Sequence, residues 1–259
     1  MSNRFLILMY HMISEPLSKD EDKYACPPSL FDKHMASLRS SGFIPVSLEA
    51  IEQHLKHQSP LPEKAVAVTL DDGFEDNFTN ALPILVKHRI PATVFLATGS
   101  IDGYNQWMTR RNFPSRKMLN WQQVTAMDQE GIAFGAHTVT HCKLPELDKE
   151  TVSYEISASK QQIEDRLGKP CRHFAYPYGL FTTDSRNAVE NAGFSLACST
   201  RSGFNTRHKD PFLLHRIEVY GNDACWKLKQ KMTFGINNAD LFFPLKYYCS
   251  RLAQRFTRK

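Results

Sequence analysis

The chain has 259 residues, of which 42% are hydrophobic and 23% charged, and its formal net charge at pH 7 is +5. This length is sufficient for one large α/β domain, and the composition excludes a disordered or fibrous protein. The small basic excess is spread over the whole chain, so no nucleic-acid partner is expected. The six cysteines are scattered without a CxxC pair, which argues against a zinc knuckle or a thioredoxin-type motif.

The N-terminal segment does not have the features of a signal peptide. Its apolar run, residues 5–9, is too short for the hydrophobic region, and no small-residue cleavage site follows it. No other stretch reaches the length that spans a bilayer. With no export signal, we expect a cytoplasmic protein whose cysteines are reduced.

The chain alternates between expected strands and expected helices. Strands are expected over residues 5–10, 44–46, 65–70, 93–97, 132–136, 173–176, 195–199 and 213–219. Helices are expected over residues 29–40, 48–57, 78–88, 121–130, 148–167 and 183–191. Asn77 and Asn120 are the expected N-caps of the third and fourth helices. Buried strands that alternate with helices favour a parallel sheet, and about seven such units predict a distorted or incomplete (β/α) barrel.

Two segments depart from this alternation. Residues 99–119 form a long loop that carries Trp107 and several arginines, and loops of this length in compact domains are usually functional or mobile. Residues 236–259 form a basic, aromatic tail after a main domain at residues 1–235. The simpler interpretation of the tail is a C-terminal helix docked on the barrel. The alternative is contact with an anionic membrane surface or a lipid-linked substrate, peripheral at the inner membrane.

Two adjacent acids, Asp71 and Asp72, follow the expected strand 65–70 and precede Gly73. Like charges at such a position repel each other and lose hydration unless a cation is bound nearby. The alternative is a helix N-cap with a spare surface acid. The end of a buried strand is where α/β folds place their active sites, so the position favours a functional role.

Further candidates follow two later strands. Histidines four residues apart share one face of a helical turn and can bind one metal ion, and His137 and His141 have this spacing. One aspartate would complete a two-histidine, one-carboxylate ligand set and leave the other as a base. The stretch Tyr176-Pro177-Tyr178-Gly179 predicts a turn that directs a backbone N–H toward an oxyanion. Each pattern alone is weak, but all three fall at the same edge of one parallel sheet.

In combination these patterns resemble the polysaccharide deacetylases, the NodB-homology group that is also called carbohydrate esterase family 4. The matching stretches are Thr69-Leu70-Asp71-Asp72-Gly73, His137-Thr138-Val139-Thr140-His141 and Tyr176-Pro177-Tyr178-Gly179. The Tyr10-His11 start and the Phe-Ala-Tyr-Pro-Tyr-Gly string are most similar to the poly-N-acetylglucosamine deacetylase branch. The resemblance covers most of the chain and implies a NodB-like catalytic domain over residues 1–235.

The resemblance also implies roles for individual residues. Asp71 is the implied general base that activates the attacking water, and the backbone N–H of Tyr178 is the implied oxyanion donor. A divalent metal ion, expected to be Zn²⁺, would be bound by Asp72, His137 and His141. The residues expected to contact the substrate are Tyr176, Pro177 and Trp121.

Two roles stay open from the sequence. The general acid is either His11, at the end of the first expected strand, or His215, near the start of the last one. We favour His11 because a strand end directs its side chain into the shared edge. Many family members have an arginine that orients the base where this chain has Ala175. The residue that holds Asp71 is therefore open, and Arg172 and the arginines of the 99–119 loop are the candidates. The family's later Asp/Trp motif has no clear match.

The expected function is metal-dependent removal of an acetyl or related small acyl group from an N-acetylated amino sugar. A cytoplasmic nucleotide- or lipid-linked precursor is expected rather than a cell-wall polymer. The alternatives are a deacylase of a non-sugar amide or an ester, and a catalytically silent carbohydrate-binding module with the same fold. The presence of both aspartates and both histidines argues against the silent module.

Overall fold

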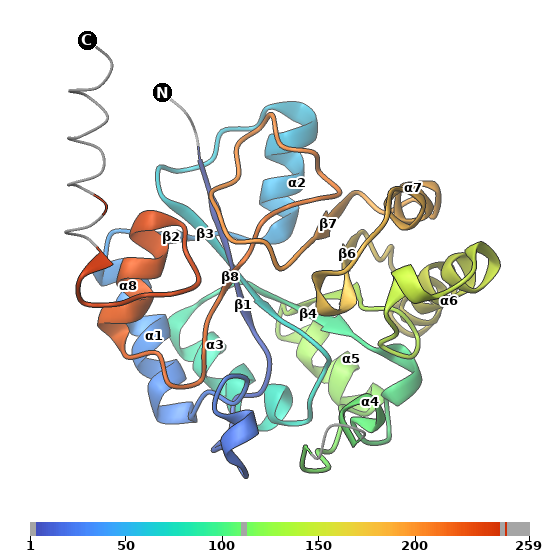
Figure 1. Cartoon of the computed structure of the whole chain (residues 1–259), viewed down its shortest axis with the longest axis horizontal. Helices are drawn as coiled ribbons and strands as arrows, with labels where there is room; N and C mark the ends of the chain where they lie inside the picture. The colour runs from blue at the N-terminus through green and yellow to red at the C-terminus, as the bar shows by residue number, and fades with distance from the viewer. Residues whose placement is uncertain (1–3, 110–112, 244–246, 248–259) are drawn as a thin grey trace.

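The computed structural model describes residues 4–109, 113–243 and 247. A curved parallel sheet lies at the centre, and helices cover its outer side (Figure 1). The strand order is β7-β6-β5-β4-β3-β1-β8, with β2 paired to β3 beside this path. All of these pairings are parallel. The predicted distorted barrel of about seven parallel strands is confirmed.

The elements mostly follow the predicted alternation of strands and helices. The strands are β1 (Leu6–Tyr10), β2 (Ile44–Pro45), β3 (Ala65–Leu70), β4 (Ala92–Leu96), β5 (Ala133–Ala136), β6 (His173–Ala175), β7 (Leu196–Cys198) and β8 (Ile217–Glu218). The α-helices are α1 (Pro28–Ser40), α2 (Leu48–His57), α3 (Leu82–His88), α4 (Gln106–Thr109), α5 (Trp121–Gln129), α6 (Lys149–Leu167), α7 (Thr183–Asn191) and α8 (Cys225–Phe234).

Side chains of each strand point alternately toward the helices and into the barrel. In β3, Val66 and Val68 pack in the large core beneath the helices, whereas Ala65 and Ala67 face a smaller core inside the barrel. The interior is narrow, and a Cβ added to Gly135 would lie 2.6 Å from the Phe95 ring. Small residues are therefore required there. Asp71 continues the inward series of β3, which places its carboxylate in the barrel rather than in solvent.

The segment 214–218 closes the barrel. Leu214 forms a parallel bridge with Cys198 at the end of β7, and β8 then pairs with β1. Arg216 lies between these two pairings and is completely buried. The expected strand 213–219 is reduced to two residues because the segment passes from one neighbouring strand to another.

Helix ends depend on local hydrogen bonds that only partly follow the prediction. Asn120 caps α5 in a capping box with Gln123, as predicted. The prediction for Asn77 is wrong, because this residue opens a π-helix (Asn77–Ala81) instead of capping α3. Its side-chain amide donates to the carbonyl oxygen of His11 at 3.0 Å, which ties the end of β1 to the motif that follows β3.

The described part of the predicted tail packs against α8. The rings of Phe243 and Tyr247 lie 5.3 and 4.9 Å from the ring of Phe234. The other residues of the predicted tail, 244–246 and 248–259, lie outside the described residues. Within the part of the chain that the structure describes, every helix is too short or too polar to cross a bilayer.

Candidate active site

A cavity of about 220 Å³ opens at the C-terminal ends of β1, β3 and β5. The strand ends direct polar side chains from distant parts of the sequence into this space. Among its lining residues are six predicted from the sequence, namely His11, Asp71, Asp72, His137, His141 and Tyr178. The parallel sheet therefore brings together residues that are separated by more than a hundred positions in the chain.

Asp72, His137 and His141 form a compact cluster of metal-ligating side chains. Their candidate ligand atoms all lie within 4.8 Å of one another. Nε2 of His141 is 3.2 Å from Oδ1 of Asp72, and Nε2 of His137 is 3.5 Å from the same oxygen. The Nδ1 atom of His137 is 2.7 Å from the carbonyl oxygen of Ala175, which can only accept a hydrogen bond. Nδ1 therefore carries the proton, and Nε2 has a free lone pair for a metal ion.

The cluster satisfies the chemical requirements of a divalent cation. Oδ1 of Asp72 is buried and makes no hydrogen bond to any residue in the described ranges. Burial alone would raise the pKa of Asp72, but the positive charge that the two histidines carry when protonated outweighs it and holds this pKa well below its ordinary value; a bound cation would act in the same direction. An ionised carboxylate and two imidazole nitrogens are a common ligand set for Zn²⁺ and related ions. The residues present therefore fit a metal site.

The loop that carries the two histidines is held by Glu155 of α6. Its buried carboxylate accepts hydrogen bonds from the backbone N–H groups of Val139 and Thr140 at 2.8 and 2.9 Å. It also accepts one from the Thr140 hydroxyl at 2.8 Å. Thr138 and His141 have φ values of 64° and 54°, so the two histidines lie in a loop after β5 rather than on one face of a helical turn. These unfavourable backbone conformations need external support, which Glu155 supplies.

We expect the substitution Glu155→Gln to weaken metal binding by about 10–100-fold, because it removes the anchor of the ligand loop. Competition with a chromophoric chelator measures the metal dissociation constant. Glu150→Gln is the matched control, because Glu150 lies on the same helix and is exposed. Equal metal affinities of the two variants would contradict the role of Glu155.

Asp71 lies beside this cluster but is bound by Arg216. The guanidinium donates to both carboxylate oxygens, at 2.6 Å to Oδ1 and 2.8 Å to Oδ2, and its Nε donates to the carbonyl oxygen of Ser199 at 3.0 Å. Burial would raise the pKa of Asp71, but Arg216 outweighs it and keeps this pKa below its ordinary value. Asp71 is therefore an ionised carboxylate with a fixed orientation.

The candidates for the partner of Asp71 that the structure describes were wrong. Of the loop arginines, Arg116 pairs with Glu21, and Arg110 and Arg111 lie outside the described residues. Arg172 is about half exposed and lies near Glu52, with Nη1 3.6 Å from Oε1. Arg216 fills the role from the segment 214–218, which closes the barrel. The signal in the sequence is an arginine directly after His215, within the expected strand 213–219.

Tyr178 and His11 lie on the cavity wall. Tyr178 has a φ of 59°, and its ring is 4.7 Å from that of His141 in an edge-on contact. The adjacent Gly179 has a φ of 68°, and a Cβ there would lie 2.0 Å from the Thr200 hydroxyl, so glycine is required for this turn. His11 extends from the end of β1, and its ring lies 5.3 Å from that of Tyr24.

His215 lies away from the cavity lining. Its Nε2 is 2.8 Å from Nζ of Lys209. Partial burial and the positive charges of Lys209 and Arg201 lower the pKa of His215. This environment disfavours a protonated imidazole, which is the form that a general acid needs.

The predicted substrate-contacting residues are placed differently from the expectation. Trp121 opens α5 on the surface, beneath the guanidinium of Arg166, and does not line the cavity. Tyr176 and Pro177 are buried at the start of the turn, and neither is in the cavity lining. The cavity lining includes a different tryptophan, Trp107, whose ring stacks on that of His141 at 4.6 Å. Its place in the long loop was the available signal.

Comparisons with known proteins agree with this geometry. The family model described as polysaccharide deacetylase matches residues 58–197, which is more than half of the chain. YxkH of Bacillus subtilis strain 168, assigned by its name to the polysaccharide deacetylases, is 29% identical over 82% of this chain and 70% of its own length. The poly-beta-1,6-N-acetyl-D-glucosamine N-deacetylase of Staphylococcus aureus strain MSSA476 is 25% identical over 78% of this chain and 70% of its own.

Solved structures give the same result. The Streptococcus pyogenes deacetylase PplD, in complex with acetate, superposes with a TM-score of 0.77 and 26% identity, covering 90% of this chain and 99% of PplD. IcaB from Ammonifex degensii superposes with a TM-score of 0.77 and 25% identity, covering 90% and 98% of the two chains. The chain belongs to the polysaccharide deacetylase family. It is accordingly a hydrolase of the carbohydrate deacetylase class, acting on carbon–nitrogen bonds other than peptide bonds.

Proposed function

We propose that this protein removes N-acetyl groups from an amino sugar in a saccharide, with a divalent metal ion, Zn²⁺ in our proposal, bound by Asp72, His137 and His141. The observation that carries the proposal is a three-residue ligand cluster beside a separately held carboxylate. Arg216 binds both oxygens of Asp71, and this carboxylate lines the same cavity as Asp72, His137 and His141. The N-deacetylase relatives support the acetylated amino sugar as substrate.

Each residue has a distinct task in this proposal. The bound ion would polarise the acyl carbonyl and lower the pKa of a nearby water. Asp71 accepts a proton from the attacking water, because it is ionised and held in place by Arg216. The N–H of Tyr178 donates to the oxygen that gains negative charge as the amide carbon becomes tetrahedral. His11, which lines the same cavity, donates a proton to the leaving amine.

A comparison of two substrates tests the proposal. Incubation with N-acetylglucosamine oligosaccharides should release acetate and free amine in equal amounts. 4-Nitrophenyl acetate, a small activated ester, reports on the reactive centre without a sugar. Hydrolysis of the ester while every N-acetylated saccharide stays intact would favour the alternative, a deacylase of non-sugar substrates. Saccharide binding without hydrolysis of either compound would favour a silent binding module.

The identity of the general acid is tested by two histidine variants. We expect His11→Ala to lower kcat on an N-acetylated oligosaccharide by about 10²–10⁴-fold, because the leaving amine loses its proton donor. His215→Ala should keep kcat near the wild-type value, since His215 does not line the cavity. The reverse order of the two kcat values would overturn the assignment.

A cytoplasmic location and contact of the tail with a membrane or lipid-linked substrate stay predictions from the sequence. Flotation with anionic liposomes, using the full chain and a chain that ends at residue 240, tests the membrane contact. The absence of lipid-dependent flotation of the full chain would contradict membrane contact of the tail.

A further inference from the structure

Two loops beside the barrel edge contribute to the cavity wall. The first loop, residues 13–26, follows β1 and provides Lys23 and Tyr24. The second loop comprises the described residues 97–109 and 113–120 between β4 and α5, and it provides Trp107, Met108 and Phe113. The roles assigned above to the metal ligands and to Asp71 do not involve these side chains.

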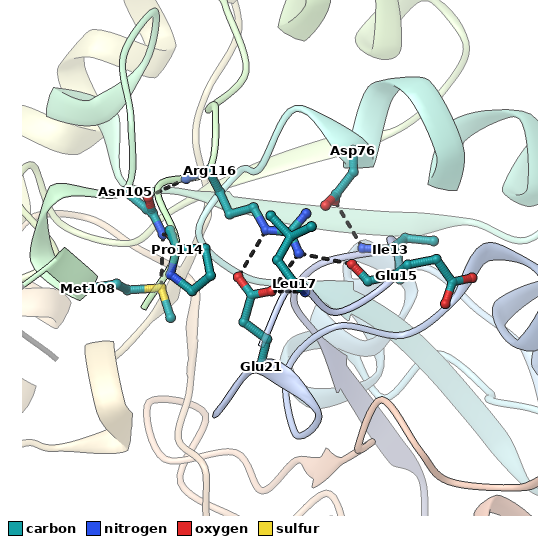
Figure 2. Close-up of polar contacts among 9 residues, drawn as sticks. All are labelled: Ile13, Glu15, Leu17, Glu21, Asp76, Asn105, Met108, Pro114 and Arg116. Atoms are coloured by element: carbon teal, nitrogen blue, oxygen red, sulfur yellow. Dashed lines mark hydrogen bonds and ion pairs between the residues drawn. The ribbon is translucent and has the colours of Figure 1, made fainter. Parts of the chain in front are cut away.

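The two loops are joined by an ion pair between Glu21 and Arg116 (Figure 2). The guanidinium donates through Nε to Oε1 at 2.9 Å and through Nη2 to Oε2 at 2.6 Å. Nη2 also donates to the carbonyl oxygen of Glu15 at 2.9 Å, and the backbone N–H of Leu17 donates to Glu21 at 2.6 Å. Arg116 of the second loop therefore holds the turn over residues 15–21 of the first loop, through hydrogen bonds to Glu15 and Glu21.

The ion pair is well shielded from water. Glu21 is completely buried, and the Arg116 side chain is 15% exposed. A buried carboxylate needs full compensation by hydrogen bonds, and a planar guanidinium fork supplies it in only one geometry. An exposed pair would have many geometries of similar energy. Glu21 and Arg116 therefore fix the relative position of the two loops.

Each loop is also connected to the reactive centre. The side-chain oxygen of Asn105 accepts a hydrogen bond from the N–H of Arg116 at 2.7 Å, and its amide donates to the carbonyl oxygen of Pro114 at 3.2 Å (Figure 2). Asn105 directly precedes α4, which carries Trp107. The first loop is anchored where the N–H of Ile13 donates to Oδ1 of Asp76 at 2.9 Å, four residues after Asp72.

The aromatic side chains of the two loops form one continuous wall. Tyr24 of the first loop contacts Phe113 of the second, with ring centroids 6.0 Å apart. Tyr24 also contacts the ring of His11 at 5.3 Å, and Trp107 stacks on His141 at 4.6 Å. The Lys23–Glu218 ion pair, 2.9 Å long, adds polar atoms to the same wall. Aromatic surfaces beside a few charged groups suit a sugar ring, which has apolar C–H faces and a rim of hydroxyls.

We propose that Glu21 and Arg116 are positioning residues whose ion pair holds the two loops together. The wall thus formed by Tyr24, Trp107 and Phe113 binds the pyranose ring that carries the reacting N-acetyl group. The inference rests on the proposed function and extends it to how the substrate is recognised. At about 220 Å³ the cavity is smaller than the roughly 300–1,000 Å³ of pockets for drug-sized ligands, so it holds one sugar ring.

Steady-state kinetics with two substrates tests the role of the Glu21–Arg116 ion pair. The substitution Arg116→Gln should raise KM for a β-1,6-linked N-acetylglucosamine trisaccharide about tenfold and leave kcat within about twofold, because it removes binding and not chemistry. Hydrolysis of 4-nitrophenyl acetate should be unchanged, since this ester does not need a sugar-binding wall. Arg116→Lys should give an intermediate KM, because lysine keeps the charge and loses the fork.

Lys117→Gln is the matched control. Lys117 is the next residue, is 57% exposed, and pairs with Glu75 at 2.7 Å, so its loss removes a surface ion pair of the same loop. Its KM should equal that of the wild type. The double variant Glu21→Gln/Arg116→Gln should have a KM no higher than the worse single variant, because the two residues act through one interaction.

Hydrogen exchange provides a readout that does not depend on activity. The amide of Leu17 should exchange faster in Arg116→Gln than in Lys117→Gln, because its acceptor Glu21 loses its anchor. Equal KM values for Arg116→Gln and Lys117→Gln would overturn the inference. A loss of ester hydrolysis equal to the loss of saccharide hydrolysis would also overturn it, since the pair would then support the reactive centre itself. If the wild-type protein cleaves the ester and leaves the trisaccharide intact, the proposed function fails instead.

Discussion

The variant Asp71→Asn should lose turnover of N-acetylated oligosaccharides by about 10²–10⁴-fold and keep its bound metal. An asparagine has nearly the same shape as the aspartate but cannot accept the proton of the attacking water. The three ligating side chains are other residues, so the metal content should stay at the wild-type level. Acetate release measures the turnover, and elemental analysis of the same preparation measures the metal content.

The two measurements distinguish a general base from a metal ligand at Asp71. If Asp71→Asn lost its metal together with its activity, Asp71 would be a member of the ligand set and the division of roles would be wrong. Turnover within a few-fold of the wild type would show that another group accepts the proton.

The substitution Arg216→Met should have the second largest effect, on both stability and catalysis. It leaves the Asp71 carboxylate buried without its partner, which costs about 3–5 kcal/mol of the free energy of unfolding. Without the guanidinium, burial dominates and the pKa of Asp71 rises. The protonated fraction of the base at a given acidic pH therefore increases, and the acidic limb of the kcat/KM profile should move to higher pH. Urea unfolding and a pH–rate profile measure the two effects.

Two variants make the Arg216 prediction specific. Arg216→Lys keeps the charge and loses the two-point contact, so it should restore part of the stability and little of the rate. Arg172→Met is the control, because Arg172 is about half exposed and lies 3.6 Å from Glu52. We expect its stability and pH profile to stay close to the wild type. Similar losses in Arg172→Met and Arg216→Met would contradict the assignment of Arg216.

The fold and the grouping of Asp72, His137 and His141 were largely predictable, because both depend on local patterns. The apolar run 65–70 followed by Asp71 and Asp72 specifies a buried strand with acids at its end, and the observed strand β3 has these bounds. His137 was placed correctly at the end of β5, and the parallel order of the strands brought it to Asp72.

The parts that failed depend on contacts between distant segments. Arg216 reaches Asp71 because the segment 214–218 changes its neighbouring strand, and no local pattern encodes that change. Trp121 was expected at the site, but the first turn of α5 directs it to the surface, whereas Trp107 approaches through a loop anchored by Asn105. Asn77 has the chemistry of an N-cap, but its amide satisfies the carbonyl of His11 instead.

The most direct test of the proposed centre is a metal titration of the metal-free protein, with acetate and free amine measured from an N-acetylglucosamine oligosaccharide. We expect both products to increase together, in equal amounts, and to reach a plateau at one equivalent of Zn²⁺ per chain. One equivalent is expected because the described residues contain a single cluster of three ligating side chains, Asp72, His137 and His141. Equal rates before and after complete removal of the metal, or acetate release without a matching amine, would contradict metal-dependent N-deacetylation at this site.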